Sequence, residues 1–277
     1  MSTEKIEHTM TDDQASGSGA PLSRQMTVAL TPEQYERLFF QPEGPKRGDF
    51  SKRFGNPTLL GLLGFLIPYT STCLILCGFQ GADPPTSLIG LTGDYYFVGG
   101  IAMVLAGVAE FILGNTFPFT VFIIFGSHWC AIAYVQDPFY NTLSAFAKLD
   151  SSAGAPWASS QGFHNVAMTL VAFVFFIATF RVNIFFVITF FGLIFFFAFI
   201  AAANFALPHV TTAAELAHVV TLLHVSGGFA FLPTICGWYL AIITACASVG
   251  IPCPLPILDL SSKVFAKHND IEHAKGA

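Results

Sequence analysis

Charged residues are scarce in this chain. Asp, Glu, Lys and Arg make up 10% of its 277 residues, whereas soluble proteins average about 25%. The formal net charge of -5 reflects no excess of basic residues, which argues against a nucleic-acid partner. In their place, hydrophobic residues reach 53%, Phe occurs 31 times and the mean hydropathy is +0.63. The composition predicts an integral membrane protein embedded in a lipid bilayer.

Several functional features are also missing. Residues 1–53 contain no apolar run that could serve as a signal-peptide core. We find no set of nucleophile, base and oxyanion donors and no metal-ligand cluster, so we expect neither an enzyme nor a metal or other cofactor. Cys73 and Cys77 share a helix face and could together bind a soft metal ion. The favoured interpretation is that they pack as small apolar side chains. The six cysteines suggest no disulfide framework.

Long apolar runs define the organisation of the chain. Each is long enough, at about 1.5 Å per helical residue, to approach or cross a hydrocarbon core of about 30 Å. The sequence therefore predicts an all-α membrane protein with six transmembrane helices, in a membrane domain of residues 54–250. We expect the six spans at 57–78, 97–114, 117–136, 163–180, 184–206 and 225–249.

The remaining segments have simpler expectations. Residues 1–53 are a polar tail that we expect to be mostly disordered, apart from a short amphipathic helix near 31–40 whose Thr and Gln fit a capping box. Residues 211–224 form an amphipathic helix leading into the last span. Pro233 is expected to kink that span because proline removes a backbone hydrogen bond. Residues 251–277 are a second polar tail.

The distribution of Lys and Arg predicts orientation. With the N-terminus in the cytosol, every Lys and Arg except Lys148 falls on the cytosolic side. The positive-inside rule therefore places both termini in the cytosol. We expect the plasma membrane as the location.

The second and third spans carry the most informative polar residues. They are joined by a tight turn of Gly114, Asn115, Thr116 and Phe117. Glu110 lies in the span before this turn and is the one acidic or basic residue that we place inside an apolar span. A group of this kind is a functional-site hypothesis by default. Two interpretations stay open: Glu110 locks the turn through nearby amides, or it couples transport to protons.

His128, in the third span, has a similar pair of interpretations. Its side chain titrates near neutral pH, so it is a candidate to accept a proton that accompanies a solute. The alternative is a neutral histidine that is hydrogen-bonded between helices. His164, His209, His218 and His224 have no metal-ligand spacing.

The start of the first span is a second candidate site. Asn56 is positioned to cap a helix that begins at Pro57. In a vestibule, the free amides at such a helix end would attract an anion such as a carboxylate. Gly61 and Gly64 permit close approach of a neighbouring helix. We take Asn56, Pro57, Gly61 and Thr120 as candidate vestibule residues.

At these residues the sequence resembles the acetate uptake transporters, which comprise bacterial succinate–acetate permeases and fungal acetate and ammonia transporters. The resemblance spans residues 54 to 250 and rests on separate motifs. Residues 56–62 (NPTLLGL) resemble the family's N-P-x-P-L-G-L. Glu110 with residues 114–117 resembles E-x3-G-N-T-F, and residues 125–129 (FGSHW) resemble Y-G-x-F-W. The turn at 178–181, and the Gly-Gly and Trp-Tyr pairs of the sixth span, also match.

The resemblance implies a six-helix protomer that encloses its own pore and assembles as a hexamer. It also implies an apolar constriction, which falls on Phe65, Phe125 and Leu193. All three lie at a similar depth, roughly 12–14 Å from the predicted cytosolic ends of their spans. Leu59 replaces the second proline of the signature. Phe125 replaces the usual tyrosine and His128 replaces a phenylalanine, which changes the polarity of the constriction.

The implied function is transport of small monocarboxylates such as acetate, with protons. The partners are then the bilayer, a small carboxylate, protons and further copies of the chain, and no nucleic acid. Two alternatives remain. One is a channel or exporter for ammonia or another small neutral solute, which an apolar constriction suits equally well. The other is a membrane sensor that signals through its N-terminal tail.

Overall fold

Six long apolar helices make up most of the part of the chain that the structure describes. The computed structural model describes residues 54–84, 86–142, 144, 146, 155–260 and 264. The predicted helix near 31–40 and most of the C-terminal tail therefore lie outside the described residues. Six helices are long and apolar enough to cross a membrane, which confirms the predicted all-α membrane fold. Apart from one isolated bridge between Asn183 and Asp259, the described regular structure is helical.

The helices alternate in direction along the chain. In order they are α3 (Thr58–Leu76), the π-helix η3 (Asp94–Ala102) continued by α4 (Met103–Ile112), α5 (Thr116–Gln136), α7 (Ala155–Thr179), α8 (Ile184–Ala206) and α9 (Ala213–Ser248). Short 3-10 turns, η1 (Phe79–Gly81), η2 (Thr86–Leu91) and η4 (Leu207–His209), lie in the connections.

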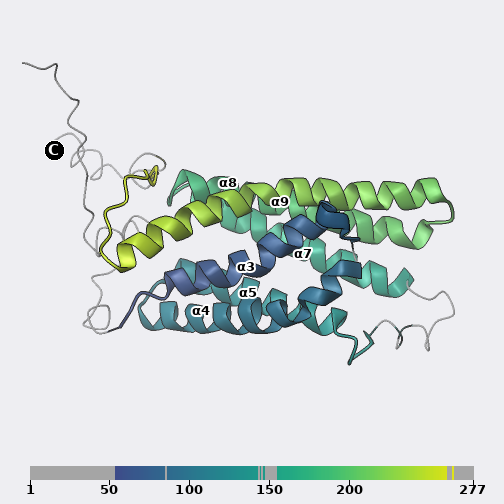
Figure 1. Cartoon of the computed structure of the whole chain (residues 1–277), viewed down its shortest axis with the longest axis horizontal. Coiled ribbons are helices and arrows are strands. Elements are labelled where there is room, and N and C mark those ends of the chain that lie inside the picture. The colour runs from purple at the N-terminus through teal and green to yellow at the C-terminus, as the bar shows by residue number, and fades with distance from the viewer. Residues whose placement is uncertain are drawn as a thin grey trace, which may run out of the picture.

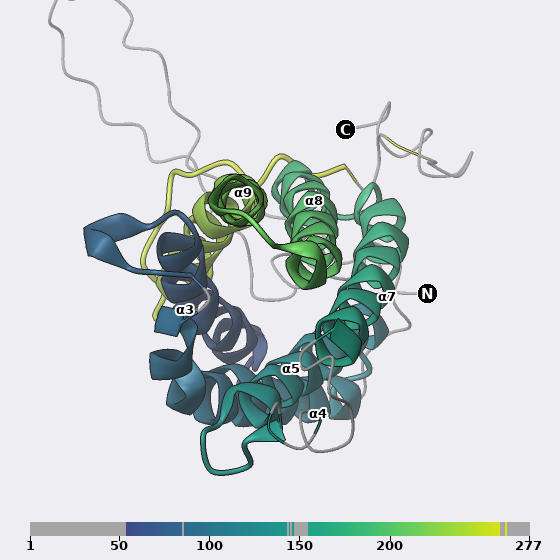
Figure 2. The ribbon, with the colours of Figure 1, turned by 90° about the vertical axis from the view of Figure 1, so that its right-hand side faces the viewer.

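The alternation gives the bundle two ends. We call the end that holds Thr58, Ile112, Thr179 and Ser248 the proximal end, and the opposite end, with the 3-10 turns, the distal end. In Figure 1 the distal end lies to the right. Figure 2 looks onto that end and shows the helices arranged around a common axis. Neighbours in contact are α7 with α8, α8 with α9, α9 with α3, α3 with η3 and α4, and α4 with α5.

Two predicted boundaries were wrong. The helix expected at 163–180 begins at Ala155, because Ser159, Ser160 and Gln161 lower the local hydropathy without breaking a helix. The approach helix at 211–224 and the span at 225–249 are one continuous 36-residue helix, α9. At 1.5 Å per residue it is about 54 Å long, so it extends well beyond a hydrocarbon core of about 30 Å.

Local sequence explains how several helices begin. The Asn183 side chain accepts a hydrogen bond from the Phe186 amide at the start of α8. Thr212 and Glu215 form a reciprocal capping box at the start of α9. Between α4 and α5, Gly114 has a φ of 81°, a left-handed conformation that glycine adopts at little cost. This glycine makes the tight turn between the two helices possible.

Pro233 lies inside α9, where the sequence predicts a kink. In Figure 1 the two halves of α9 run in visibly different directions. Proline interrupts the backbone hydrogen-bond ladder and so permits a bend of this kind. Gly192 of α8 lies directly against Pro233, where an added Cβ would come within 2.6 Å of the proline ring. The missing side chain lets α8 and α9 pack closely at this point.

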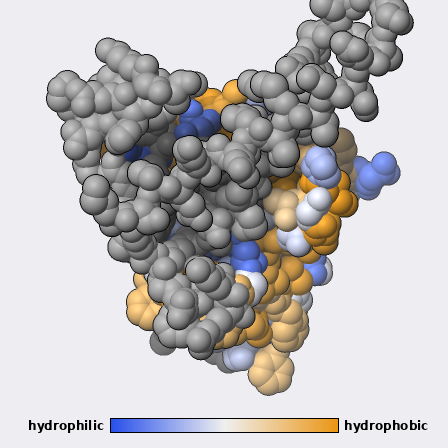
Figure 3. Space-filling view, turned by 90° about the vertical axis from the view of Figure 1, so that its left-hand side faces the viewer, coloured by the Kyte–Doolittle hydropathy of each residue, from blue (hydrophilic) through white to orange (hydrophobic). Residues whose placement is uncertain are grey.

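Apolar side chains face outward along the helices. Phe97, Leu170, Val174 and Ile235 are each more than 60% exposed, as expected for residues that contact lipid. Figure 3 shows apolar residues along one flank of the proximal end. The exposed and the buried faces are therefore both apolar, and the polar residues of the spans stand out as exceptions.

Residues after α9 return to the bundle at its proximal end. The Ile184 amide donates to the Leu258 carbonyl at 3.2 Å, and the Leu260 amide donates to the Val182 carbonyl at 3.1 Å. The Tyr239 hydroxyl donates to the Pro256 carbonyl at 2.8 Å. We call residues 251–260 the C-terminal strap. It ties the turn between α7 and α8 to α9.

Candidate functional site

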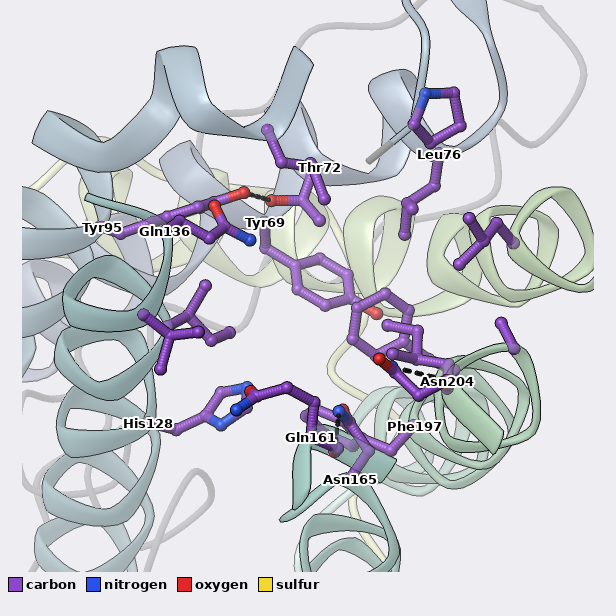
Figure 4. Close-up of a pocket in the computed structure, with 18 of the residues that line it drawn as sticks. Tyr69, Thr72, Leu76, Tyr95, His128, Gln136, Gln161, Asn165, Phe197 and Asn204 are labelled. Atoms are coloured by element: carbon purple, nitrogen blue, oxygen red, sulfur yellow. Dashed lines mark hydrogen bonds between the residues drawn. The ribbon is translucent and has the colours of Figure 1, made fainter. Parts of the chain in front are cut away.

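A cavity of about 210 Å³ occupies the distal half of the bundle. Its wall includes Tyr69 and Thr72 of α3, His128 and Trp129 of α5, and Asn165 of α7, together with residues of α8 and α9. Figure 4 shows polar side chains from these elements around a shared space. The cavity extends inward as far as Phe65 and Phe125.

Among the described residues, the cavity wall includes no Asp, Glu, Lys or Arg. Asn165 and Asn204 each donate a side-chain hydrogen bond to a backbone carbonyl of their own helix, that of Gln161 and Ile200 respectively. Apolar walls with a few placed polar groups are typical of small-molecule sites. The lining favours a small, neutral or singly charged solute.

One side of the wall is built from aromatic residues. The Tyr95 hydroxyl is hydrogen-bonded to Thr72 at 2.8 Å, as Figure 4 shows. The Tyr95 ring stacks on Trp129 with centroids 5.0 Å apart. Tyr95 belongs to the π-helix η3, a rare geometry that often marks functional sites. The added width of the π-helix brings this ring against the cavity.

His128 and His164 form a pair across α5 and α7. His128 Nδ1 and His164 Nε2 are 2.8 Å apart, and the rings stack with centroids 5.0 Å apart at 12°. One nitrogen of this contact donates and the other accepts, so the bridge holds one proton. The geometry matches the expected histidine hydrogen-bonded between helices. Proton coupling by His128 stays a prediction. The contact between His128 and His164 was not predicted from the sequence.

Aromatic rings close the cavity on its inner side. Phe125 lies 6.1–6.2 Å, centroid to centroid, from the four other rings of this cluster. We call the cluster the aromatic plug; its members are Phe65, Phe125, Phe175, Phe190 and Phe197. It draws residues from α3, α5, α7 and α8, which are four of the six spanning helices. Three of its members, Phe65, Phe125 and Phe197, line the cavity, so the plug lies at the inner side of the cavity.

The predicted constriction residues occupy this region in different ways. Phe65 and Phe125 are in edge-to-face contact and both line the cavity. Leu193 is 1% exposed and belongs to the same core cluster as Phe125, but the described residues that line the cavity do not include it. The role of all three as a constriction remains a prediction.

Glu110 lies at the proximal end and is fully buried. Its Oε1 accepts a hydrogen bond from the Thr58 hydroxyl at 2.6 Å, and its Oε2 accepts one from the Asn115 side-chain amide. The Asn115 backbone amide also donates to the Glu110 carbonyl at 2.9 Å. Glu110 therefore joins the start of α3 to the α4–α5 turn. This agrees with the turn-locking interpretation and adds the Thr58 hydroxyl as a partner.

The four candidate vestibule residues also lie at the proximal end. Asn56 accepts a hydrogen bond from the Thr58 amide at 2.9 Å, and Pro57 directly precedes α3. Gly61 lies against the ring of Phe122. The Thr120 hydroxyl donates to the Thr116 carbonyl at 2.8 Å. None of the four is among the described residues of the cavity wall, so their vestibule role stays a prediction.

Several cavity residues were missed from the sequence. They include Tyr69, Thr72, Tyr95, Gln161 and Asn165, and His164 was missed as the partner of His128. A usable signal existed on α7, because Gln161, His164 and Asn165 follow at helical spacings of three and four and so share one face. The predicted start at residue 163 placed Gln161 outside the span. Within the described part of the chain no group of three or more metal-ligating side chains is found.

Six membrane-spanning helices around an uncharged cavity that ends at an aromatic plug define a membrane protein suited to passing small solutes. Residues 40–261 match the family model described as the GPR1/FUN34/yaaH family. The chain belongs to this family.

Named relatives sharpen this assignment. The chain is 34% identical over 240 residues to Protein alcS of Aspergillus fumigatus, covering 85% of this chain and 86% of that protein. It is 26% identical to the acetate transporter protein patA of Aspergillus clavatus, covering 69% and 73% respectively. It is 29% identical to ammonia transport outward protein 2 of Saccharomyces cerevisiae, covering 55% and 52%.

A solved structure supports the same conclusion. The bacterial acetate channel SatP aligns with a TM-score of 0.56 and 25% identity, covering 74% of this chain and 99% of that one. The family thus consists of membrane transporters and channels for small solutes rather than enzymes.

Proposed function

We propose that the protein moves small monocarboxylates such as acetate across the membrane together with a proton. The observation that carries the proposal is the uncharged cavity that ends at the aromatic plug. A carboxylate that enters without its proton loses water and meets no charged group in the described wall, which is costly. Removing water from the protonated acid costs less free energy than removing it from the carboxylate. The methyl group of the acid can pack against the Phe rings. The relatives named as acetate transporters and channels support this substrate.

The pathway begins at the distal end. The solute enters the cavity, reaches Phe65 and Phe125, and crosses when these rings change rotamer. An apolar constriction of this kind passes a hydrated ion poorly. Leu193 lies in the same core cluster and is the third proposed constriction residue. The Lys and Arg distribution supports cytosolic termini, so the distal mouth faces outward, in our proposal from the plasma membrane.

His128 is the better placed of the two proton-coupling candidates. It lines the cavity and contacts His164, Trp129 and Phe197, so a proton can pass between the solute and the pair. Glu110 lies at the proximal end and has hydrogen bonds to both carboxylate oxygens. We propose that it acts mainly by holding α3 to the α4–α5 turn. A hexamer, as the resemblance implies, completes the proposed assembly.

Labelled acetate uptake into proteoliposomes tests the proposal. With the outside more acidic than the lumen, we expect uptake to exceed that measured at equal pH several-fold, because the outward-facing cavity then receives protonated acid. Protein-free vesicles correct for the acid that crosses the lipid itself. Protein-dependent uptake that ignores the pH gradient contradicts the proton part, and no protein-dependent uptake contradicts the acetate part.

Ammonia is the second candidate solute. An uncharged wall suits a neutral molecule, and one relative is named as an ammonia transport outward protein. The same vesicles decide between the two, because an ammonium pulse that alkalinises the lumen faster than in protein-free vesicles reports ammonia entry. A fast ammonium response without protein-dependent acetate uptake favours this candidate.

A further inference from the structure

Three hydrogen-bond donors in the cavity wall, the Tyr69 hydroxyl and the indole N–H groups of Trp129 and Trp157, have no partner among the described residues. Two of them, on Tyr69 and Trp129, belong to rings that contact each other. Tyr69 is 1% exposed and Trp129 is 3% exposed. Neither the Tyr69 hydroxyl nor the Trp129 indole N–H has a hydrogen-bond partner among the described residues. Leaving a buried donor unpaired costs about 1–3 kcal/mol, so most buried polar groups are satisfied. Both side chains line the cavity, which makes a bound molecule the natural source of a partner.

Neighbouring rings hold the two donors in place. Tyr69 stacks on Phe65 with centroids 4.6 Å apart, and it meets Trp129 edge to face at 6.4 Å. The Trp129 ring lies against Gly99 of η3, where a Cβ would come within 2.6 Å of the indole. Figure 4 shows the Tyr69 ring projecting among the other side chains of the cavity wall. The two rings that carry the donors are therefore in contact and held by their neighbours.

The contrast with Tyr95 shows that pairing was available on this wall. Tyr95 is equally buried and also lines the cavity, but its hydroxyl is hydrogen-bonded to Thr72. Of these two tyrosine hydroxyls in one wall, that of Tyr95 is used by the protein and that of Tyr69 has no partner among the described residues.

The chemistry of the pair restricts its ligand. An indole N–H only donates, and a phenol donates readily, so the ligand has to offer acceptor atoms. A carboxyl group offers two oxygens on one carbon, whereas an ammonium ion offers no acceptor. Phe65 stacks directly on Tyr69, so an apolar ring lies beside the donors to receive a short alkyl group.

We propose that the Tyr69 hydroxyl and the Trp129 indole N–H form a carboxyl-binding subsite for small monocarboxylic acids, on the distal side of the aromatic plug. The proposal rests on the proposed transport of such acids and names the residues that select them. The carboxyl group accepts from both donors while its alkyl group lies against Phe65. Ammonium and alkylammonium ions are not bound by this subsite.

Fluorescence of a single tryptophan tests the subsite by binding alone. The chain has three tryptophans, so Trp157→Phe with Trp238→Phe leaves Trp129 as the only reporter. This background also removes the unpaired indole N–H of Trp157 from the cavity wall, so acetate binding that persists in it shows that the subsite does not depend on that donor. Titration of this purified protein with acetate is expected to give a saturable change in Trp129 emission, and titration with methylammonium chloride is expected to give none. Adding Tyr69→Phe to this background is expected to weaken the apparent acetate affinity about three- to tenfold, as loss of one hydrogen bond implies.

Tyr239→Phe in the same background is the control, because the Tyr239 hydroxyl donates to the Pro256 carbonyl and Tyr239 is not among the described residues of the cavity wall. It removes a hydroxyl that the protein itself uses, so the acetate affinity is expected to stay within twofold while the unfolding midpoint falls. Tyr69→Phe removes an unpaired hydroxyl, so its unfolding midpoint is expected to stay or rise. The opposite assignment of the two effects overturns the subsite.

Transport separates failure of the subsite from failure of the proposed function. In otherwise wild-type protein, Tyr69→Phe and Trp129→Phe are each expected to raise the KM for acetate uptake. Normal acetate uptake with unchanged KM and unchanged affinity in Tyr69→Phe overturns the subsite and leaves the proposed function standing. Absence of both protein-dependent uptake and binding in the parent protein overturns the two together.

Discussion

Two buried polar sites, one in each half of the bundle, differ in how their groups are hydrogen-bonded. In the proximal half, Glu110 is fully buried and both of its carboxylate oxygens accept hydrogen bonds. In the distal half, the Tyr69 hydroxyl and the Trp129 indole are almost as buried and have no partner among the described residues. Paired groups join helices, and unpaired groups in a cavity are available to a solute. The comparison supports a stabilising role for the Glu110 site and agrees with our proposal that the cavity receives the solute.

The largest expected effect comes from breaking the proximal half. Glu110→Ala leaves the Thr58 hydroxyl and the Asn115 amide without their acceptor, at about 1–3 kcal/mol for each. We expect a loss of about 4 kcal/mol in the free energy of unfolding, which lowers the unfolding midpoint by roughly 10 °C. Thermal unfolding of the detergent-solubilised protein measures it.

Glu110→Gln is the matched control for this substitution. Its amide keeps the shape of the side chain and one acceptor oxygen, so we expect a smaller loss of stability. An Ala variant as stable as the parent protein contradicts the assignment of Glu110 to holding the helices together.

Truncating one ring of the aromatic plug is expected to have the next largest effect. Phe125→Ala deletes the ring that contacts the other four rings of the plug. We expect a loss of about 3 kcal/mol in stability, together with faster acetate uptake that depends less on the size of the acid. Uptake of acetate and of longer monocarboxylates into vesicles measures both changes.

Phe173→Ala provides the control for the plug. Phe173 is on α7 and is 50% exposed, so its truncation removes an outward-facing ring of the same size. We expect no change in the rate or selectivity of uptake. Equal behaviour of the two variants would argue against a constriction at Phe125.

The smallest expected effect concerns the histidine pair. His164→Phe leaves His128 buried without its hydrogen-bond partner, at a cost of about 1 kcal/mol. The double variant His128→Phe, His164→Phe is expected to recover this loss, because no unpaired imidazole remains. A double-mutant cycle on the unfolding midpoint measures the coupling.

The same variants test proton coupling. If His128 passes the proton, acetate uptake by the double variant loses much of its dependence on external pH, whereas a purely structural pair leaves the pH profile unchanged. The stability and pH readouts are therefore independent, and each can fail without the other.

The spans were predictable from the sequence because their apolar runs are long and carry few charges. The number of spans was confirmed. The Asn56 side chain accepts a hydrogen bond from the Thr58 amide, although α3 begins at Thr58, one residue later than predicted, and its N-cap residue is Pro57. Hydropathy failed at Ala155 and across residues 211–225, where polar residues continue a helix. Hydropathy reports contact with lipid, whereas helix continuity depends on the backbone and on the absence of helix-breaking residues.

The site was predictable only in part. Phe65, Phe125, Glu110 and His128 could be singled out because each belongs to a motif or is unusual in its span. The partners of these residues could not be found, because His164 lies 36 positions from His128 and Thr58 lies 52 positions from Glu110. Such contacts depend on how the helices pack. Nothing in the sequence singled out Tyr69, because its distinguishing feature is a buried hydroxyl without a hydrogen-bond partner among the described residues. Such a feature is visible only in the folded structure.

The C-terminal strap has a consequence for the order of assembly. The Leu258 carbonyl and the Leu260 amide form hydrogen bonds with backbone groups beside the α7–α8 turn. The Pro256 carbonyl accepts a hydrogen bond from the Tyr239 hydroxyl. The ribosome synthesises these residues only after all six spanning helices. The α7–α8 hairpin therefore gains these hydrogen bonds only after the whole membrane domain has been synthesised. A chain that stops after α9 lacks them.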